Sequence, residues 1–171
     1  MKALSLSVMS DAVIRPAQLQ DCADVLRLMQ ALAAFEGYLA EFVVTEADLT
    51  RLCFNEQRFG ILVAELDDKI EAMLVYYFQP FTYDLSPWLI VKELFVSANC
   101  RGLSMGQQLM AAAAEICAEK GGKKMKWEVL THNVKAQRFY QRLGATLAAD
   151  WRIMTLTVDC SSGQQTLKAS T

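Results

Sequence analysis

An arginine and two glycines separate an apolar run from an amphipathic run in the stretch NCRGLSMGQQL, residues 99–109. The apolar run, residues 89–96, predicts a strand, and the residues from Met105 onward predict a helix. Glycines let a ligand approach the backbone closely, and the free amides at a helix N-terminus favour an anion. The spacing therefore indicates a phosphate or pyrophosphate site, with a tight strand-to-helix turn as the alternative.

Other chemistries find less support in the chain. The stretch matches neither the P-loop pattern G-x-x-x-x-G-K-[ST] nor the dinucleotide pattern G-x-G-x-x-G. The single histidine, His132, and cysteines that are never spaced C-x-x-C predict no metal site. The five cysteines are Cys22, Cys53, Cys100, Cys117 and Cys160. Scattered and odd in number, they are typical of reduced thiols in a cytoplasmic protein.

Length and charge set the class of partner. The chain has 171 residues, of which 53% are hydrophobic, so one full core is expected. A net charge of −2 gives no footprint for nucleic acid, and no apolar run is long enough for a membrane span. The expected partner is a small molecule or a protein. We expect a leader without structure over residues 1–12, a domain over 13–159 and a loose tail over 160–171. A signal peptide is the poorer alternative for the leader.

Strands and helices alternate along the domain. The expected strands are residues 12–17, a hairpin within 58–78 that turns at 67–69, and the runs 88–96, 124–130 and 151–158. The expected helices begin at Asp21, Thr45, Met105 and Asn133, and the first ends at Gly37. Thr45 with Asp48, and Ser104 with Gln107, match the capping-box pattern. The order predicts a mixed α+β sheet with one parallel crossover, between residues 88–96 and 124–130.

The motif R-G-x-x-x-G after an apolar strand, followed by N-x-x-A-x-x-F-Y-x-x-x-G-A, resembles the GNAT superfamily of acetyl-CoA-dependent N-acetyltransferases. The stretches IRPAQLQDCADVLRLMQAL, YYFQPFTYD, ELFVSANCRGLSMG and DWR are similar to its diamine (spermidine/spermine) branch. The resemblance runs from Val13 to Asp159. It implies an α+β GNAT fold, with a mixed central sheet splayed at the cofactor cleft and helices on both faces. The pantetheine arm of acetyl-CoA would lie between residues 88–96 and 124–130.

The resemblance also implies roles for particular residues. The cofactor-binding positions are Leu94, Phe95, Val96, Arg101, Gly102, Leu103, Ser104, Met105, Gly106, Asn133 and Ala136. Among them, the amides of residues 101–106 would hold the pyrophosphate, and residues 94–96 would pair with pantetheine like an added strand. Tyr140 matches the general acid that protonates the leaving thiolate, with a core aromatic as the alternative.

The amine substrate needs a base, because only about one molecule in two thousand of a lysine-like amine is neutral near pH 7. Glu93 is the candidate base. Phe35, Glu36 and Lys92 are candidate substrate-binding residues, although Glu36 could equally be a solvated acid at a helix end. Lys92 stands where the diamine enzymes carry an acid, and Ser104 stands where the family commonly has glycine. A cation at Lys92 disfavours a polyamine and favours an amine that carries a carboxylate.

The sequence thus predicts an N-acetyltransferase that transfers acetyl from acetyl-CoA to a primary amine of a small diamine, polyamine or lysine-like substrate by direct attack. The alternatives are another amine, such as an amino acid, an aminoglycoside-like compound or a protein lysine, and a CoA-binding sensor without turnover. A homodimer is expected from the resemblance, and the positive mean hydropathy of +0.18 agrees with it.

Overall fold

The computed structural model describes residues 11–80, 82–150 and 152–156. It divides into two compact units, Met1–Leu130 and Thr131–Thr171, which are described separately below. The predicted tail, Cys160 and most of the predicted leader lie outside the described residues.

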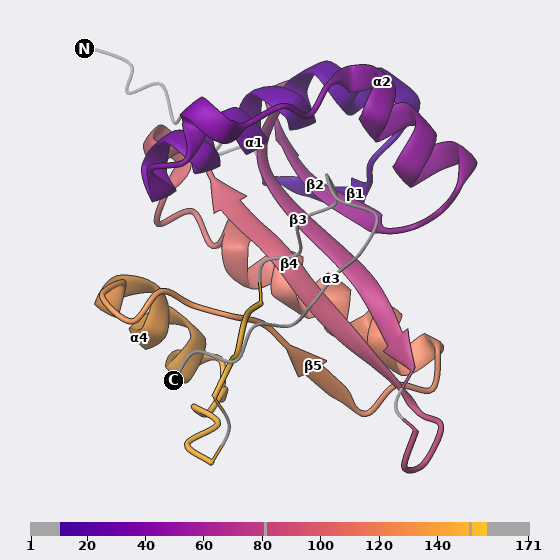
Figure 1. Cartoon of the computed structure of the whole chain (residues 1–171). Coiled ribbons are helices and arrows are strands. Elements are labelled where there is room, and N and C mark those ends of the chain that lie inside the picture. Colours follow the sequence, from indigo (N-terminus) through magenta and orange to yellow (C-terminus); the bar gives the residue numbers. More distant parts are fainter. Residues whose placement is uncertain (1–10, 81, 151, 157–171) are drawn as a thin grey trace, which may run out of the picture. The chain divides into compact units, whose positions relative to one another are not determined.

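The first unit is built on one five-stranded sheet (Figure 1). Its strands are β1 (Val13–Pro16), β2 (Gly60–Leu66), β3 (Lys69–Pro80), β4 (Pro87–Val96) and β5 (Lys124–Lys126), in that order across the sheet. The first four are antiparallel to their neighbours, whereas β5 runs parallel to β4. The predicted hairpin and the predicted parallel pair are therefore both confirmed.

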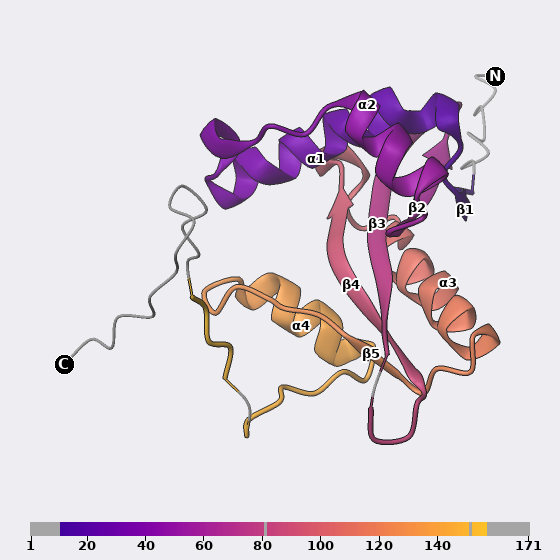
Figure 2. The same cartoon turned by 45° about the vertical axis from the view of Figure 1, so that its right-hand side comes forward.

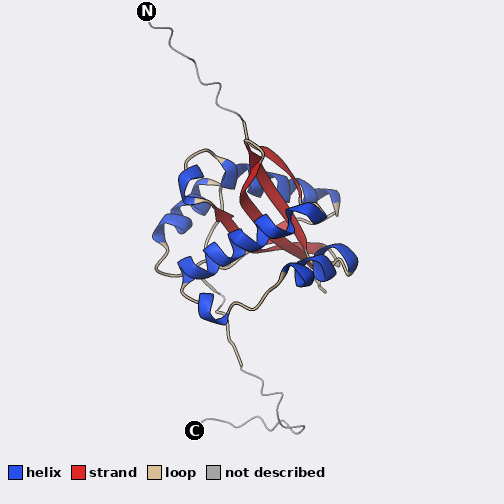
Figure 3. Ribbon diagram, turned by 90° about the horizontal axis from the view of Figure 1, so that it is seen from above, coloured by secondary structure: helices blue, strands red, loops and turns tan. Residues whose placement is uncertain are grey.

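Helices cover both faces of this sheet, as predicted (Figures 2 and 3). The helix α1 (Cys22–Glu36) and the short helix α2 (Glu46–Leu49) lie on one face, and α3 (Met105–Glu119) lies on the other. Side chains alternate between the two faces of a strand. On the face that α1 covers, Val63 and Met73 pack with Leu28 of α1 in one buried cluster. The buried face of α3 consists of Met105, Leu109, Met110, Ala113 and Cys117. In the described part of the chain, no helix has the length and apolar character to cross a membrane.

Local signals explain where the first helices begin and end. The predicted capping box at Thr45 is present, since its hydroxyl accepts the Asp48 amide at 3.2 Å and its amide donates to the Asp48 carboxylate at 3.1 Å. Beyond α2 the chain continues as a π-helix, Thr50–Asn55. Gly37 ends α1 with a left-handed φ of 87°, which glycine adopts without steric cost. Single 3₁₀ turns occupy Leu19–Asp21, Leu39–Glu41 and Ala98–Cys100.

Two strand predictions fail in part. The strand expected over 124–130 ends at Lys126, because its ladder with β4 stops at Ile90, just before β4 is bent by a bulge. The strand expected over 151–158 is wrong for residues 152–156, which form no ladder. Its alternating pattern had no partner strand to pair with there. The remaining residues of that strand lie outside the described part of the chain.

The second unit contains α4 (Val134–Arg142). Its predicted N-cap is confirmed, because the Asn133 side-chain oxygen accepts the Ala136 amide at 3.1 Å. Past the helix end, Gly144 has a left-handed φ of 90°. The predicted start and end of this helix are thus both correct.

Candidate functional site

Strand β4 contains a β-bulge where the sequence places its two adjacent charges. Glu93 pairs with Val75 and Val91 pairs with Tyr76, so Lys92 is an extra residue with no partner on β3. In a regular strand, neighbouring side chains point to opposite faces. The bulge changes this alternation, and both Lys92 and Glu93 line the same cavity.

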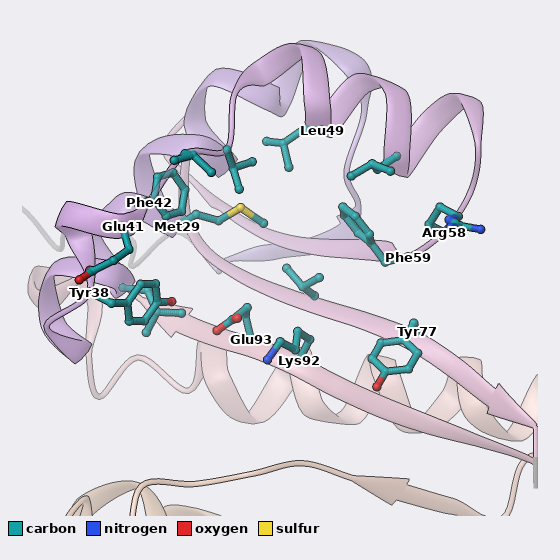
Figure 4. A pocket seen from close by; sticks show the side chains of 15 residues that line it. Met29, Tyr38, Glu41, Phe42, Leu49, Arg58, Phe59, Tyr77, Lys92 and Glu93 are labelled. Carbon is teal, nitrogen blue, oxygen red and sulfur yellow. The ribbon is translucent and has the colours of Figure 1, made fainter. Parts of the chain in front are cut away.

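This cavity, called the amine pocket below, has a volume of about 440 Å³ (Figure 4). Its walls come from α1, the segment between α1 and α2, α2 with the π-helix, the residues just before β2, and strands β3 and β4. The lining residues are Met29, Leu32, Tyr38, Glu41, Phe42, Val43, Val44, Leu49, Leu52, Arg58, Phe59, Val75, Tyr77, Lys92 and Glu93. Most are apolar or aromatic, so the pocket suits an alkyl chain whose charged groups meet the few polar side chains.

Glu93 is the half-buried carboxylate of the amine pocket. Burial raises the pKa of Glu93 above its usual range, the Lys92 ammonium lowers it in part, and the Glu36 carboxylate raises it further. A carboxylate with a raised pKa is a better proton acceptor than an exposed one. The environment of Glu93 is therefore that of a candidate general base.

The two candidate residues at the end of α1 both lie outside this pocket. Neither Phe35 nor Glu36 belongs to its lining, although the charge of Glu36 reaches Glu93. Phe35 is 57% exposed and lies under the guanidinium of Arg101, 5.8 Å from the ring centroid. Phe35 thus contacts the loop of the expected cofactor site.

Beyond Ile90, the edge of β4 that faces β5 has no ladder partner in the part of the chain that the structure describes. This stretch is called the open edge below. The Ser97 amide donates to the Glu71 carbonyl of β3 at 2.8 Å, and backbone groups of successive residues point to opposite edges of a strand. By this alternation, the main-chain groups of Leu94 and Val96 face away from β3, with Phe95 between them. The Val96 carbonyl accepts only the side chain of Arg101, at 3.4 Å, among the described residues. An extended polar chain could pair along this edge as an added strand.

The loop after β4 presents main-chain amides at the start of α3. Gly102 and Ser104 have left-handed φ angles of 89° and 62°. The Gln108 amide makes the first helical hydrogen bond, to the Ser104 carbonyl at 3.0 Å, so the amides of Met105 and Gly106 precede the helical ladder. The side chain of the N-cap residue, Ser104, caps none of these amides. The loop therefore fits the pyrophosphate of a CoA-type ligand.

The predicted capping box between Ser104 and Gln107 is wrong. Ser104 is the N-cap residue, but its side chain accepts no amide of the first turn. An N-cap hydroxyl reaches that turn from an extended backbone, as Thr45 does, whereas the backbone of Ser104 is left-handed.

The remaining candidate residues lie in the second unit. Asn133 and Ala136 are joined by the N-cap hydrogen bond of α4. Tyr140 is half-buried on α4, and its ring meets that of Phe139 edge-on, with 5.1 Å between the centroids.

The structure adds residues that the sequence analysis missed. Tyr38, Phe42 and Tyr77 line the amine pocket, the first two from the segment between α1 and α2 and the third from β3. The signal for Tyr38 was an aromatic residue directly after the glycine that ends α1. For Tyr77 no local signal exists, because a tyrosine in a strand is most often a packing residue.

Comparison with known proteins agrees with this geometry. Residues 26–145 match the acetyltransferase (GNAT) family. The chain is 30% identical over 156 residues to the thialysine N-epsilon-acetyltransferase of Sus scrofa, covering 84% of this chain and 91% of the relative. It is also 30% identical over 143 residues to the spermidine/spermine N(1)-acetyltransferase-like protein 1 of Homo sapiens, covering 77% of this chain and 20% of that protein.

The fold also resembles that of solved structures. An aminoglycoside acetyltransferase from an uncultured soil metagenomic sample, in complex with sisomicin, superposes with a TM-score of 0.76 at 20% identity. The match covers 87% of this chain and 97% of that one. Together with the family match over most of the chain, these findings show that the protein belongs to the GNAT family and is an acetyl-CoA-dependent N-acetyltransferase.

Proposed function

We propose that this enzyme acetylates the terminal primary amine of a lysine-like substrate, one that carries a carboxylate as well as an ammonium group. The observation that carries the proposal is the bulge in β4, which brings Glu93 and Lys92 to the same pocket. Glu93 attracts the ammonium group, and Lys92 attracts a carboxylate. The thialysine acetyltransferase relative, whose named substrate is lysine-like, supports the same class.

Glu93 acts as the general base. Its carboxylate accepts a proton from the substrate ammonium, directly or through a water molecule, and the free amine lone pair becomes the nucleophile. The apolar walls of the pocket hold the alkyl chain. This environment favours the proton transfer, because it raises the pKa of the acceptor.

Acetyl-CoA supplies the activated acetyl group as a thioester. The amides of Met105 and Gly106 would hold its pyrophosphate, and the open edge at Leu94 and Val96 would hold its pantetheine arm. The Tyr140 hydroxyl would donate a proton to the leaving sulfur. The role of Tyr140 rests on its match to the F-Y position of the family motif.

Lys92 controls the choice of substrate. Its ammonium repels the second cationic group of spermidine or spermine and attracts a carboxylate, and salt weakens both effects because Lys92 is exposed. A diamine or polyamine should therefore be a poorer substrate than a lysine analogue of similar length.

A panel of amines with acetyl-CoA tests this, with release of the CoA thiol as the signal. Wild type should use thialysine, lysine or ornithine with a higher kcat/KM than spermidine or spermine. Lys92→Glu should shift that ratio about tenfold toward the polyamines, or about 1.4 kcal/mol. The control is Lys69→Glu, which reverses an exposed charge outside the amine pocket. The proposal fails if wild type prefers spermine and Lys92→Glu leaves the ratio unchanged.

A further inference from the structure

Tyr38 owes its position to the end of α1. Gly37 takes the left-handed conformation, and the amides of Gly37 and Tyr38 both donate to the Ala33 carbonyl, at 2.9 and 3.0 Å. These bonds satisfy a carbonyl of the last turn and fix where the chain leaves the helix. The side chain of Tyr38 is thus presented from a defined helix end.

Tyr38 and Glu93 line the amine pocket from different elements. Figure 4 shows the hydroxyl of Tyr38 directed toward the part of the pocket where the Glu93 carboxylate lies. Tyr38 is 36% exposed. No hydrogen bond joins the two side chains in the described part of the chain, so the phenol and carboxylate oxygens both remain available to a ligand.

The charges around Tyr38 show that it shares the electrostatic environment of Glu93. Burial raises the pKa of Tyr38, and the carboxylates of Glu93 and Glu36 raise it further. A phenol with a pKa above its ordinary value of about 10 stays protonated near neutral pH. Tyr38 is therefore suited to holding a cation, and not to exchanging a proton with it.

We propose that Tyr38 is a substrate-positioning residue whose hydroxyl oxygen, together with the Glu93 carboxylate, binds the reacting ammonium group of the amine. This inference rests on the proposed function, since it names the second contact of the same group. An ammonium has three N–H donors and can bond to both oxygens at once. The ring of Tyr38 can add a cation–π contribution. Two bonds place the ammonium group at this end of the pocket.

Phe42 completes this end of the pocket without competing for the cation. It lines the pocket beside Tyr38, has no polar atom, and follows the turn Leu39–Glu41. The ammonium group would thus meet the oxygens of Tyr38 and Glu93 while part of the alkyl chain meets the Phe42 ring. Polar and apolar side chains of the pocket would thus contact different parts of the substrate, its reacting ammonium group and its alkyl chain.

The test is steady-state kinetics of Tyr38→Phe, which removes the hydroxyl and keeps the ring. The KM for the preferred amine should rise about tenfold, the size expected for loss of one hydrogen bond to a charged group. The kcat at saturating amine and the KM for acetyl-CoA should change less than twofold. Tyr38→Leu also removes the ring and should raise the amine KM further. The control is Tyr83→Phe, an equally conservative change at a tyrosine that is 88% exposed outside the pocket.

The two proposals fail in different ways. If wild type uses no lysine-like amine, the proposed function is wrong, whatever Tyr38 does. If wild type uses such an amine and Tyr38→Phe keeps the wild-type amine KM, the positioning role alone is wrong. A fall in kcat with an unchanged amine KM would also overturn that role, because Tyr38 would then act after binding. A rise in both KM values together with a lower melting temperature would overturn it as well, by assigning Tyr38 to the stability of the pocket.

Discussion

Glu93 has two properties that oppose each other. Burial raises its pKa, which makes it a better base, and the same burial destabilises the folded protein whenever the carboxylate is ionised. The pKa of Glu93 is higher in the folded than in the unfolded state. Its favourable contribution to the free energy of unfolding is therefore complete below the unfolded pKa and is lost as the pH rises through the folded pKa. Near neutral pH an ionised Glu93 therefore lowers the free energy of unfolding, and its proposed role as the base would account for its presence.

Glu93→Gln should separate these properties. The variant loses the base, so kcat/KM should fall by about 10²- to 10⁴-fold. The melting temperature at pH 7 should rise, because the amide is buried without a charge.

In wild type, kcat/KM should fall as the pH drops through the raised pKa of Glu93. Lys92→Met should move this fall in kcat/KM to higher pH, since the Lys92 ammonium lowers the pKa of Glu93. Parallel pH profiles of Glu93→Gln and wild type would contradict the assignment.

Tyr140 offers a second test at a single residue. Tyr140→Phe keeps the ring that packs against Phe139 and removes only the hydroxyl. For a general acid, kcat should fall about 10²-fold, or about 2.7 kcal/mol, while the affinity for acetyl-CoA stays near that of wild type. Rapid-quench measurement of the chemical step provides the check. A full rate of that step in the variant would make Tyr140 a packing residue.

At the scale of elements, an ion-pair network joins the first strands to the start of α1. Both terminal nitrogens of the Arg15 guanidinium, in β1, donate to the Asp21 carboxylate, at 2.6 and 3.0 Å. Its Nε donates to the Glu65 carboxylate of β2 at 2.9 Å. Asp21 is 5% exposed and also accepts the Gln18 amide at 2.7 Å. The Arg15 guanidinium lowers the pKa of Asp21. This network therefore sets the position of α1 against the sheet.

Asp21→Asn should lower the free energy of unfolding by about 2 kcal/mol, because it leaves Arg15 without its buried partner. Since the folded pKa of Asp21 is lowered, its contribution is present above the unfolded value and is lost as the pH falls through the folded one. Urea denaturation at pH 7 and at low pH measures both effects. The control is Asp24→Asn, whose pair with Arg27 is exposed and should contribute 0.5 kcal/mol or less, by the usual magnitude of about 0.3–0.5 kcal/mol for such pairs. Equal losses in the two variants would contradict the assignment.

At the scale of the whole molecule, β4 carries the proposed sites of both substrates. Its bulge places Glu93 in the amine pocket, and its next residues form the open edge that leads to the amides of α3. One strand thus brings the expected sites of amine and thioester close together. Ligand binding at that edge should stabilise the folded state as a whole.

Free CoA at about 100 times its Kd should raise the free energy of unfolding by about 2.7 kcal/mol. Gly106→Pro removes one amide donor and adds a ring where phosphate would approach, so this stabilisation should largely disappear. Gly106→Ala keeps the donor and should retain most of it. Thermal melts with and without CoA give the comparison, and dephospho-CoA should behave like CoA. Unchanged stabilisation by CoA in a folded Gly106→Pro variant would show that the amide is not part of the site.

Much of the fold could be predicted because its signals are local. The capping box at Thr45, the glycine after α1 and the N-cap at Asn133 each act within one helical turn. The failed predictions depended on distant partners. The pattern of residues 152–156 required a neighbouring strand. Ser104 matched a capping pattern, but its loop imposes a left-handed backbone.

The sequence by itself determined which chemistry is present: a carboxylate in a central strand, a glycine-containing turn before a helix, and the motif around Tyr140. These features follow from residue types at short spacing. Tertiary structure decided where Lys92 points, because the bulge in β4 depends on the register between β3 and β4. It also decided that Tyr38 and Glu93 line one pocket, since the two residues are far apart in the chain and only packing of α1 on the sheet brings them there.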